Sequence, residues 1–214
     1  MSGHQPEGRL LSFEGLDGCG KGTQLDRVEA WLRERGHVVE RYREPGGSEV
    51  SEAIRAILLD PAHEVLAGET ELLLFTAARV QLLKERVLPA LTRGRVVLLD
   101  RFADSTTAYQ GHGRRLPLGM VEALNQLVRG LAWPERTFWL DLDPATALAR
   151  AGSTDRMERA GLDFFRRVRD GYAALAAAEP LRIVRVDAAG TPEVVFARLE
   201  PELTRLFAGR KDPS

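Results

Sequence analysis

Short apolar runs that alternate with segments of helical spacing constrain the fold of this 214-residue chain most strongly. Each run has the length of a strand and is bounded by turn residues, and several are apolar throughout, as in strands buried on both faces of a parallel sheet. The runs cover residues 10–13, 38–42, 96–99, 137–142 and 181–186. This alternation of strands and helices predicts an α/β domain with a doubly wound parallel sheet.

Helical spacing is found between these runs and after the last one. The segments concerned are residues 23–35, 70–92, 162–178 and 192–207. In the first segment, Leu25, Val28 and Leu32 share one face, which predicts an amphipathic helix. Pro89 should kink or end the second helix, because proline lacks the backbone N–H that a helix needs. The residues expected on the buried face of this second helix are Leu73, Leu74, Ala77, Leu82, Val87 and Leu91.

Composition excludes several classes of protein. Thirty Lys and Arg residues stand against thirty-one Asp and Glu, and the resulting formal charge of −1 predicts no general attraction to nucleic acid or to an acidic membrane. The single cysteine, Cys19, excludes an internal disulfide and a cysteine-rich zinc site and is typical of a reducing cytosol. No uninterrupted apolar run reaches about 18 residues. We expect one cytoplasmic domain over residues 1–214, with frayed tails at 1–8 and 209–214 and with neither a nucleic-acid nor a membrane partner.

A glycine-rich stretch directly follows the first apolar run and directly precedes the first helical segment. It reads Gly15-Leu16-Asp17-Gly18-Cys19-Gly20-Lys21-Gly22-Thr23. Glycines let the backbone curl so that its N–H groups point inward, the helix N-terminus adds its positive end, and Lys21 reaches the outer phosphates. The stretch therefore predicts a phosphate-binding loop for a nucleoside triphosphate.

The loop departs from the usual pattern at one position, because Gly22 replaces the Ser or Thr whose hydroxyl normally binds magnesium. Thr23 lies one position further on. We therefore expect the magnesium ion to be held mostly by phosphates, by water and by a carboxylate, with Asp17 and Asp100 as the candidates. A thiolate at Cys19 would repel phosphates, so we interpret Cys19 as a small space-filling residue.

The residues after the third apolar run indicate which chemistry the loop serves. Asp100 directly follows this run and can hold magnesium or its water at the edge where open α/β sheets bind ligands. Many ATPases follow this aspartate with a glutamate that activates water, whereas here Arg101 follows, whose fork grips a phosphate and cannot act as a base. This favours transfer to a phosphorylated acceptor over hydrolysis. The only asparagine, Asn125, precedes Gln126, so the Asn-Lys-x-Asp sequence of GTPases is absent.

Transfer between two phosphate groups needs positive charge, because donor and acceptor repel one another and the moving group spreads charge over its oxygens. The candidates are arginines near predicted strand ends: Arg43, Arg79, Arg101, Arg150 and Arg156. Arginine is abundant in this chain, so a solvated surface role stays open for each of them.

Several further stretches follow one another along the chain. They are Phe13-Glu14-Gly15-Leu16-Asp17-Gly18, Arg43-Glu44-Pro45-Gly46-Gly47, Leu72-Leu73-Leu74-Phe75-Thr76-Ala77-Ala78-Arg79, Asp100-Arg101-Phe102-Ala103-Asp104-Ser105-Thr106-Thr107-Ala108-Tyr109-Gln110-Gly111, and Asp155-Arg156-Met157-Glu158 with Gly161-Leu162-Asp163-Phe164-Phe165. Together they closely resemble the thymidylate kinase family, whose members phosphorylate dTMP to dTDP with ATP. The resemblance covers residues 10–207 in the order of the family.

The resemblance implies the three-layer P-loop NTPase fold, an α/β fold in which a parallel five-stranded sheet is flanked by helices, with a short mobile lid at about 150–161. It implies ATP and dTMP as substrates in dTTP biosynthesis and Mg²⁺ as the cofactor. It also implies a homodimer built by packing helices from each subunit. Two alternative functions stay open: another nucleoside monophosphate kinase, and a nucleotide-binding regulator without turnover.

For the base of the acceptor, the resemblance implies that Phe75 stacks on thymine and that Arg79 hydrogen-bonds its edge. A flat aromatic face suits a base, and an arginine fork suits a carbonyl oxygen. The spacing alone also allows Phe75 a place in the helix core. The resemblance further implies that Ser105, Thr106 and Gln110 lie near the base.

For the sugar and phosphates, the resemblance implies that Tyr109 presses against the sugar, where its bulk selects deoxyribose. Arg101 and Arg43 would hold the acceptor phosphate, and Asp17 would lie near the sugar hydroxyl and the metal. The residues expected to carry catalysis are Lys21, Asp100, Arg101, Arg150 and Arg156.

Two departures from the family pattern affect these expectations. Ala78 stands where the family often has an aspartate, so one support of Arg79 is expected to be missing. The phosphate-binding loop lacks the arginine that some members carry, which points to the bacterial-type arrangement, where a lid arginine stabilises the transferring phosphate. Arg150, Arg156 and Arg159 are the candidates for this role, and the sequence does not choose among them.

Overall fold

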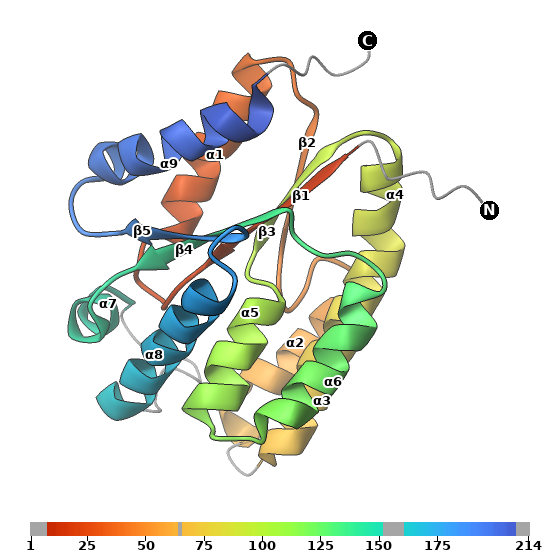
Figure 1. The fold of residues 1–214 in the computed structure, drawn as a ribbon. Coiled ribbons are helices and arrows are strands. Elements are labelled where there is room, and N and C mark those ends of the chain that lie inside the picture. The colour runs from red at the N-terminus through yellow and green to blue at the C-terminus, as the bar shows by residue number, and fades with distance from the viewer. Residues whose placement is uncertain (1–7, 64–65, 152–160, 209–214) are drawn as a thin grey trace.

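The computed structural model describes residues 8–63, 66–151 and 161–208, and its centre is a parallel sheet (Figure 1). The strands are β1 (Arg9–Glu14), β2 (Val39–Arg43), β3 (Val96–Asp100), β4 (Arg136–Asp141) and β5 (Ile183–Asp187). They lie in the order β2-β3-β1-β4-β5, and each neighbouring pair is parallel. This arrangement confirms the predicted five-stranded parallel sheet and brings the carboxyl ends of all its strands to one edge.

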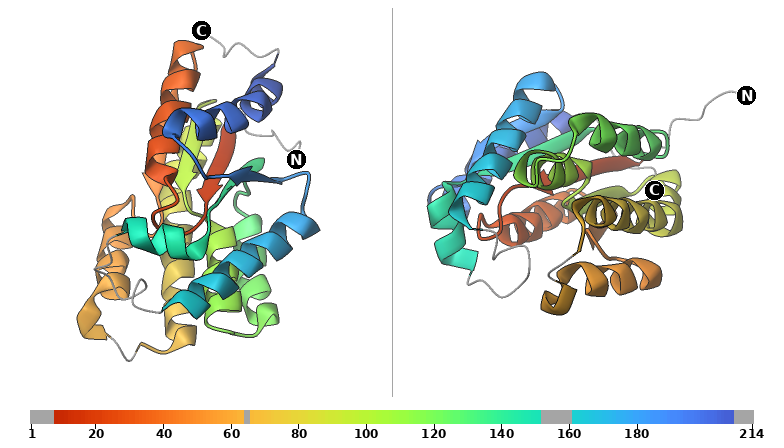
Figure 2. Two further views of the ribbon diagram at one scale, coloured as in Figure 1. Left: turned by 90° about the vertical axis from the view of Figure 1, so that its left-hand side faces the viewer. Right: turned by 90° about the horizontal axis from the view of Figure 1, so that it is seen from below.

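Helices cover both faces of the sheet, which gives the three layers expected (Figure 2). On one face lie α1 (Lys21–Glu34) and α9 (Pro192–Phe207), which contact each other. On the other face lie α3 (Gly68–Leu82), α4 (Leu88–Thr92), α6 (Leu118–Arg129) and α8 (Leu162–Ala178). Leu25, Val28 and Leu32 of α1 are fully buried, as predicted.

The chain also forms helices that the spacing did not predict. They are α2 (Glu49–Leu59), the short 3₁₀ helix η1 (Pro61–His63), α5 (Ala103–Thr106), α7 (Pro144–Ala151) and also α6, whose bounds are given above. Two segments have the wider turns of a π-helix, η2 (Leu83–Val87) and η3 (Thr107–Gly113). In η3 the N–H of Arg114 donates to the carbonyl of Tyr109, five residues earlier, at 2.8 Å.

The buried face predicted for the long helix after residue 70 is wrong in its first half. Leu73 is 56% exposed and Ala77 is exposed, whereas Glu71 and Arg79 point inward and are buried. The prediction is confirmed for Leu82, Val87 and Leu91. Two physical causes explain the error. The inner face of α3 carries polar side chains in place of an apolar stripe, and the π-turns of η2 shift the phase of any single helical wheel drawn through both halves.

The ends of the predicted lid and tails are partly described. The predicted lid begins within α7, which contains Arg150 and ends at Ala151. Arg156 and Arg159 lie outside the described residues, as do residues 1–7 and 209–214. Gly8 was expected to be part of a frayed tail, but its N–H donates to the carbonyl of Leu91 at 3.0 Å.

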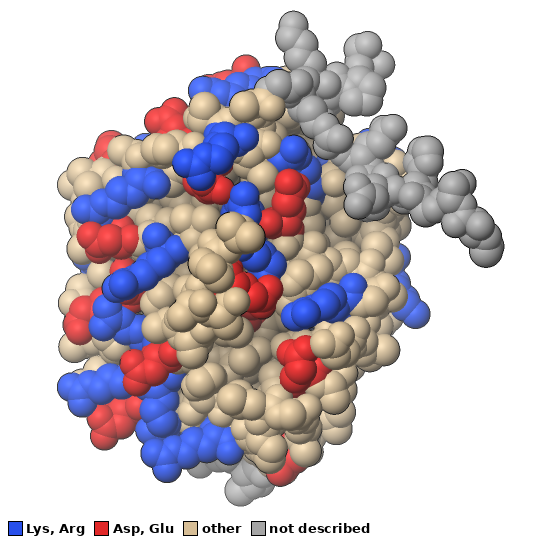
Figure 3. Space-filling view, in the orientation of Figure 1, with Lys and Arg blue, Asp and Glu red and all other residues tan. Residues whose placement is uncertain are grey.

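Charged side chains of both signs are interspersed over the face drawn in Figure 3, in agreement with the near-zero formal charge. Within the described part of the chain, none of the helices combines the length and the apolar character needed to cross a bilayer.

A buried ion pair ties α5 to the start of β5. Arg182 donates through Nη1 to Oδ2 of Asp104 at 2.7 Å and through Nη2 to Oδ1 at 2.8 Å. The two side chains are only 10% and 3% exposed. Glu179 accepts two further hydrogen bonds from the same guanidinium. The pair therefore anchors α5, which follows the carboxyl end of β3, to the residue that precedes β5.

Substitution Asp104→Ala is expected to lower the free energy of unfolding by about 3 kcal/mol, because it leaves the Arg182 charge buried with less compensation. The control is Asp26→Ala, whose carboxylate is 72% exposed in its pair with Arg41. That change should cost no more than about 0.5 kcal/mol. Urea unfolding of the two variants provides the measurement, and equal losses would contradict a stabilising role for the buried pair.

A second buried carboxylate, Glu14, ends the central strand β1. Its Oε1 accepts the N–H of Phe102 at 2.7 Å, and its Oε2 accepts the hydroxyls of Ser105 at 2.5 Å and Tyr172 at 2.9 Å. Burial, reinforced by the nearby charge of Asp104, raises the pKa of Glu14 to about 7. Glu14 thus connects the strand below the site to the turn that carries the site.

Glu14→Gln should make the free energy of unfolding less dependent on pH. With a pKa raised to about 7, folded Glu14 binds more protons than the unfolded chain above about pH 4.5, so its contribution lowers stability as the pH rises towards 8. Glutamine does not titrate, and its amide can still donate to the two hydroxyls. Urea unfolding between pH 5 and pH 8 should show a difference in slope of the order of 1–3 kcal/mol over that range. The exposed variant Glu34→Gln should keep the wild-type slope, and a wild-type slope in Glu14→Gln would contradict this account.

Candidate functional site

The glycine-rich stretch forms the connection between β1 and α1, as predicted. Gly18 and Gly20 have φ values of 80° and 93°, a left-handed conformation that favours glycine. A Cβ atom on Gly18 would lie 2.1 Å from the carbonyl oxygen of Ala147. Lys21 begins α1 and is buried, and its Nζ donates back to the carbonyls of Gly15 at 3.2 Å and Leu16 at 3.0 Å. The loop thus has the curled backbone and inward lysine that a phosphate ligand requires.

A cavity above this stretch, here called the loop cavity, has charged and glycine residues in its wall. They are Asp17, Gly18, Gly20, Lys21, Gly22, Thr23, Arg43, Glu44, Arg55, Asp100, Arg101 and Arg150. The structure therefore brings together most of the residues predicted for the triphosphate and metal. The side chains of Leu16 and Cys19 are buried beneath the loop and do not line the cavity.

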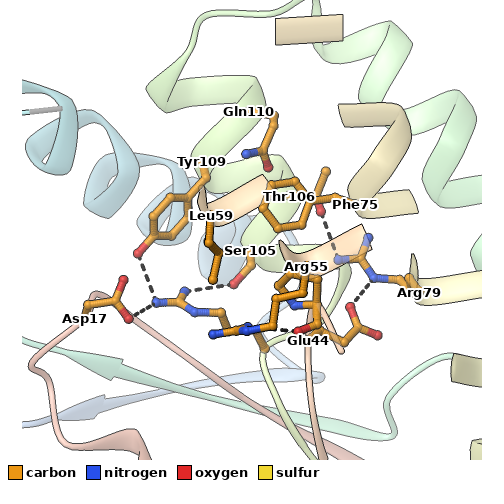
Figure 4. A pocket seen from close by; sticks show the side chains of 12 residues that line it. Asp17, Glu44, Arg55, Leu59, Phe75, Arg79, Ser105, Thr106, Tyr109 and Gln110 are labelled. Atoms are coloured by element: carbon orange, nitrogen blue, oxygen red, sulfur yellow. Dashed lines mark hydrogen bonds and ion pairs between the residues drawn. The ribbon is translucent and has the colours of Figure 1, made fainter. Parts of the chain in front are cut away.

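A second cavity, here called the aromatic cavity, is drawn in Figure 4 and shares part of its wall with the first. It is lined by Asp17, Glu44, Pro45, Arg55, Leu59, Phe75, Arg79, Arg101, Ser105, Thr106, Tyr109 and Gln110. Phe75 projects into it from α3, and Tyr109 and Gln110 project from η3. Of the residues predicted to bind the acceptor, only Arg43 is outside this wall. Arg43 lines the loop cavity, and its guanidinium pairs with Glu52 at 3.0 Å.

Arg101 lines both cavities and is held by partners from three directions. Its Nη2 donates to Oδ1 of Asp17 at 2.7 Å and to the hydroxyl of Tyr109 at 3.2 Å, and its Nη1 donates to Oγ of Ser105 at 3.1 Å. Its backbone has a φ of 71°, which is uncommon for a residue with a side chain. The guanidinium is thereby fixed at the junction of the two cavities.

The charges at this junction keep Asp17 ionised. Burial alone would raise the pKa of the Asp17 carboxyl, but Arg101 and Lys21 hold it well below its usual value. Lys21 Nζ lies 3.7 Å from the same carboxylate. Burial raises the pKa of the Tyr109 phenol far above its usual range, so this hydroxyl stays protonated. The junction therefore presents two cations, one carboxylate and a neutral phenol.

Arg79 is fully buried on α3 and is held by groups from two other segments. Its Nε donates to Oε2 of Glu44 at 2.6 Å, and its Nη2 donates to the carbonyl of Phe102 at 3.1 Å and to Oγ1 of Thr106 at 3.0 Å. Although Ala78 supplies no carboxylate, Arg79 is still paired with one, because Glu44 reaches it from 35 residues away.

The pair of Glu44 and Arg79 leaves one donor and one acceptor unused. Nη1 of Arg79 and Oε1 of Glu44 are buried and have no hydrogen-bond partner among the described residues. Buried polar atoms are seldom left unpaired, so these two atoms are suited to a ligand in the aromatic cavity. Burial raises the pKa of Glu44 to about 7, although Arg79 opposes this shift.

Several residues that line the two cavities were not predicted from the sequence. Glu44 and Pro45 stood in a noted stretch that also suits a turn, and Arg55 and Leu59 lie on α2, which was not predicted. A start signal for that helix was present. Ser48 precedes a first turn that contains two glutamates, as helix N-termini often do.

The metal ligands expected from the sequence lie in the loop cavity. Asp17 and Asp100 both line it, as does Thr23, and carboxylate and hydroxyl oxygens are the ligands that Mg²⁺ prefers. In the described residues, no group of three or more His, Cys, Asp or Glu side chains is arranged to hold a metal by itself. This donor set fits an ion that is completed by phosphate oxygens and water.

Comparison with known proteins agrees with the geometry. The model of the thymidylate kinase family matches residues 13–199. The thymidylate kinase of Chlorobaculum parvum is 44% identical over 92% of this chain and 96% of its own length, and that of a Synechococcus species is 45% identical over 94% and 99%. The crystal structure of thymidylate kinase from Ehrlichia chaffeensis superposes with a TM-score of 0.76 and 30% identity, covering 92% of this chain and 98% of that one. The chain therefore belongs to the thymidylate kinase family.

Proposed function

We propose that this chain transfers the γ-phosphoryl group of ATP to dTMP, forming ADP and dTDP, as a step of dTTP biosynthesis. Membership of the family supports this reaction. The structural observation that carries the proposal is the shared wall of the two cavities. Asp17, Glu44, Arg55 and Arg101 line both of them, so nucleotides bound on either side would meet phosphate to phosphate.

On the donor side, we propose that the backbone amides of Gly15-Leu16-Asp17-Gly18-Cys19-Gly20-Lys21-Gly22-Thr23 surround the phosphates of ATP. Lys21 would exchange its two carbonyl partners for phosphate oxygens. Asp17 and Asp100 would hold Mg²⁺ directly or through water. When bound, the ion neutralises charge on the donor phosphates.

On the acceptor side, we propose that Phe75 stacks on thymine while the unused Nη1 of Arg79 donates to a carbonyl of the base. Ser105, Thr106 and Gln110 would complete the pocket of the base, and Tyr109 would lie against the deoxyribose. Arg101 would hold the phosphate of dTMP, supported by Arg55 in the shared wall. Arg43 is closer to the donor side and would have to leave Glu52 in order to take part.

In the reaction, an oxygen of the dTMP phosphate attacks the γ-phosphorus in line, and the bond from that phosphorus to the oxygen of ADP breaks. The chain contributes position and positive charge, and no covalent intermediate with the protein is needed. Arg150 is exposed on α7 and lines the loop cavity, which supports it as the lid arginine. Arg156 remains a candidate from the resemblance.

We also propose a homodimer built by packing helices. Large apolar side chains are exposed on three neighbouring helices, with Ile57 on α2, Leu73 on α3 and Leu127 on α6 each more than 40% exposed: 42%, 56% and 58%. α3 contacts both other helices. An apolar surface of this kind is suited to a second copy of the chain. A cytoplasmic location remains a prediction.

The function is tested by a panel of acceptors assayed with ATP and Mg²⁺, in which dTMP, dUMP, UMP, CMP, AMP and GMP are compared. We expect dTMP to have the highest kcat/KM and turnover to stop when the ion is chelated. A higher value for AMP or CMP would identify another nucleoside monophosphate kinase. The absence of any dTMP-dependent release of ADP would instead support a regulator without turnover.

The lid assignment predicts that alanine at the arginine contacting the transferring phosphate lowers kcat by orders of magnitude while the affinity for dTMP changes little. Arg150→Ala, Arg156→Ala and Arg159→Ala are compared by steady-state kinetics. Arg166→Ala is the matched control, because Arg166 is 62% exposed on α8 and pairs with an exposed aspartate. Near-normal turnover in all three lid variants would contradict the assignment.

A further inference from the structure

Glu71 is a buried carboxylate for which neither the reaction nor the fold has yet supplied a role. It lies on α3 and is 1% exposed, and its Oε1 accepts a hydrogen bond from Nε2 of Gln110 at 2.8 Å. Glu71, Phe75 and Arg79 follow one another at intervals of four residues, so they share one face of α3. This face therefore combines two residues of the aromatic cavity with a carboxylate that holds a third, Gln110.

The contact determines which way the amide of Gln110 points. An ionised carboxylate only accepts hydrogen bonds, so the atom of Gln110 that faces Glu71 must be the donor Nε2. Gln110 is itself 1% exposed and lines the aromatic cavity. Its oxygen then lies on the side of Phe75, as Figure 4 shows. Gln110 accordingly offers an acceptor to a ligand in this cavity.

Arg114 reinforces this orientation. Its Nη2 lies 3.3 Å from Oε2 of Glu71 and its Nε lies 3.4 Å from Oε1. Arg114 and Gln110 thus both donate to the Glu71 carboxylate, and this geometry opposes rotation of the Gln110 amide.

We propose that Glu71 is a positioning residue that fixes the Gln110 amide and thereby selects thymine over cytosine. The proposal rests on the function proposed above. Thymine carries a carbonyl oxygen at position 4 and an N–H at position 3, whereas cytosine carries an amino group and a bare nitrogen. Arg79 offers its unused donor and Gln110 offers an acceptor. This pair matches thymine and opposes cytosine at both positions.

Glu71→Gln tests the proposal with almost no change in volume. The new amide has one donor and one acceptor, and the acceptor is drawn to the cation Arg114. Its donor then faces Gln110, which must rotate and present its own donor to the base. We expect KM for dTMP to rise roughly 10- to 100-fold with a smaller change in kcat, because one buried hydrogen bond is lost. The ratio of kcat/KM for dCMP to that for dTMP should rise at least about tenfold.

The matched control is Glu122→Gln on α6, where an exposed glutamate accepts a hydrogen bond from Nε2 of Gln126 at 2.5 Å. This variant should keep both the KM for dTMP and the wild-type ratio. The exchange variant Glu71→Gln/Gln110→Glu restores one carboxylate and one amide to the same space, with an acceptor again facing the base. It should recover part of the lost affinity for dTMP.

The outcomes separate this proposal from the function on which it rests. If the wild type does not phosphorylate dTMP, the proposed function fails. If the wild type phosphorylates dTMP but Glu71→Gln keeps the wild-type ratio of kcat/KM for dCMP to that for dTMP, the positioning role is overturned. An equal decrease of kcat/KM for the two substrates leaves this ratio unchanged and counts as the same outcome. Loss of the cooperative thermal transition in both Glu71→Gln and the exchange variant would likewise overturn it, because Glu71 would then serve only the fold.

Discussion

The fixed guanidinium of Arg101 is the element on which both cavities depend. Two phosphate groups repel each other, and a cation that is already in position stabilises their approach without reorganisation. Asp17, Ser105 and Tyr109 hold this side chain between the cavities. Glu14 supports the unusual backbone conformation of Arg101, because its carboxylate accepts the N–H of the next residue, Phe102. The central strand β1 thus supports the junction as well as the phosphate-binding loop.

Buried carboxylates support the acceptor side in the same manner. Glu14 holds Ser105, Glu44 holds Arg79, and Glu71 holds Gln110. Each supported side chain lines the aromatic cavity, so it is oriented before any ligand arrives. The raised pKa values of Glu14 and Glu44 show that this order costs stability near neutral pH. These two buried carboxylates, which orient the site for a ligand, therefore lower the stability of the fold near neutral pH.

The sheet and the phosphate-binding loop could both be predicted from the sequence, because the pattern that indicates each of them lies in contiguous residues. Continuous apolar runs predict strands buried on two faces, and the loop follows the first run directly. The resemblance anticipated most residues of the aromatic cavity. The pairing of Glu44 with Arg79 was not predictable, since it joins residues 35 positions apart that only the fold brings together. Helical spacing also failed for Leu73, because site side chains occupy the inner face of α3 and the π-turns of η2 break the period.

The wide turns of η3 have a consequence for how this protein can diverge. Tyr109 and Gln110 are consecutive, yet both reach the aromatic cavity from this segment. Deleting one residue would restore an ordinary α-helix there and swing the second side chain away, since π-turns arise from a single extra residue. The glycine-rich loop is built on a different element and would be untouched. Small insertions or deletions in η3 could therefore give descendants of this enzyme new phosphate-acceptor substrates while the loop that binds ATP stays unchanged.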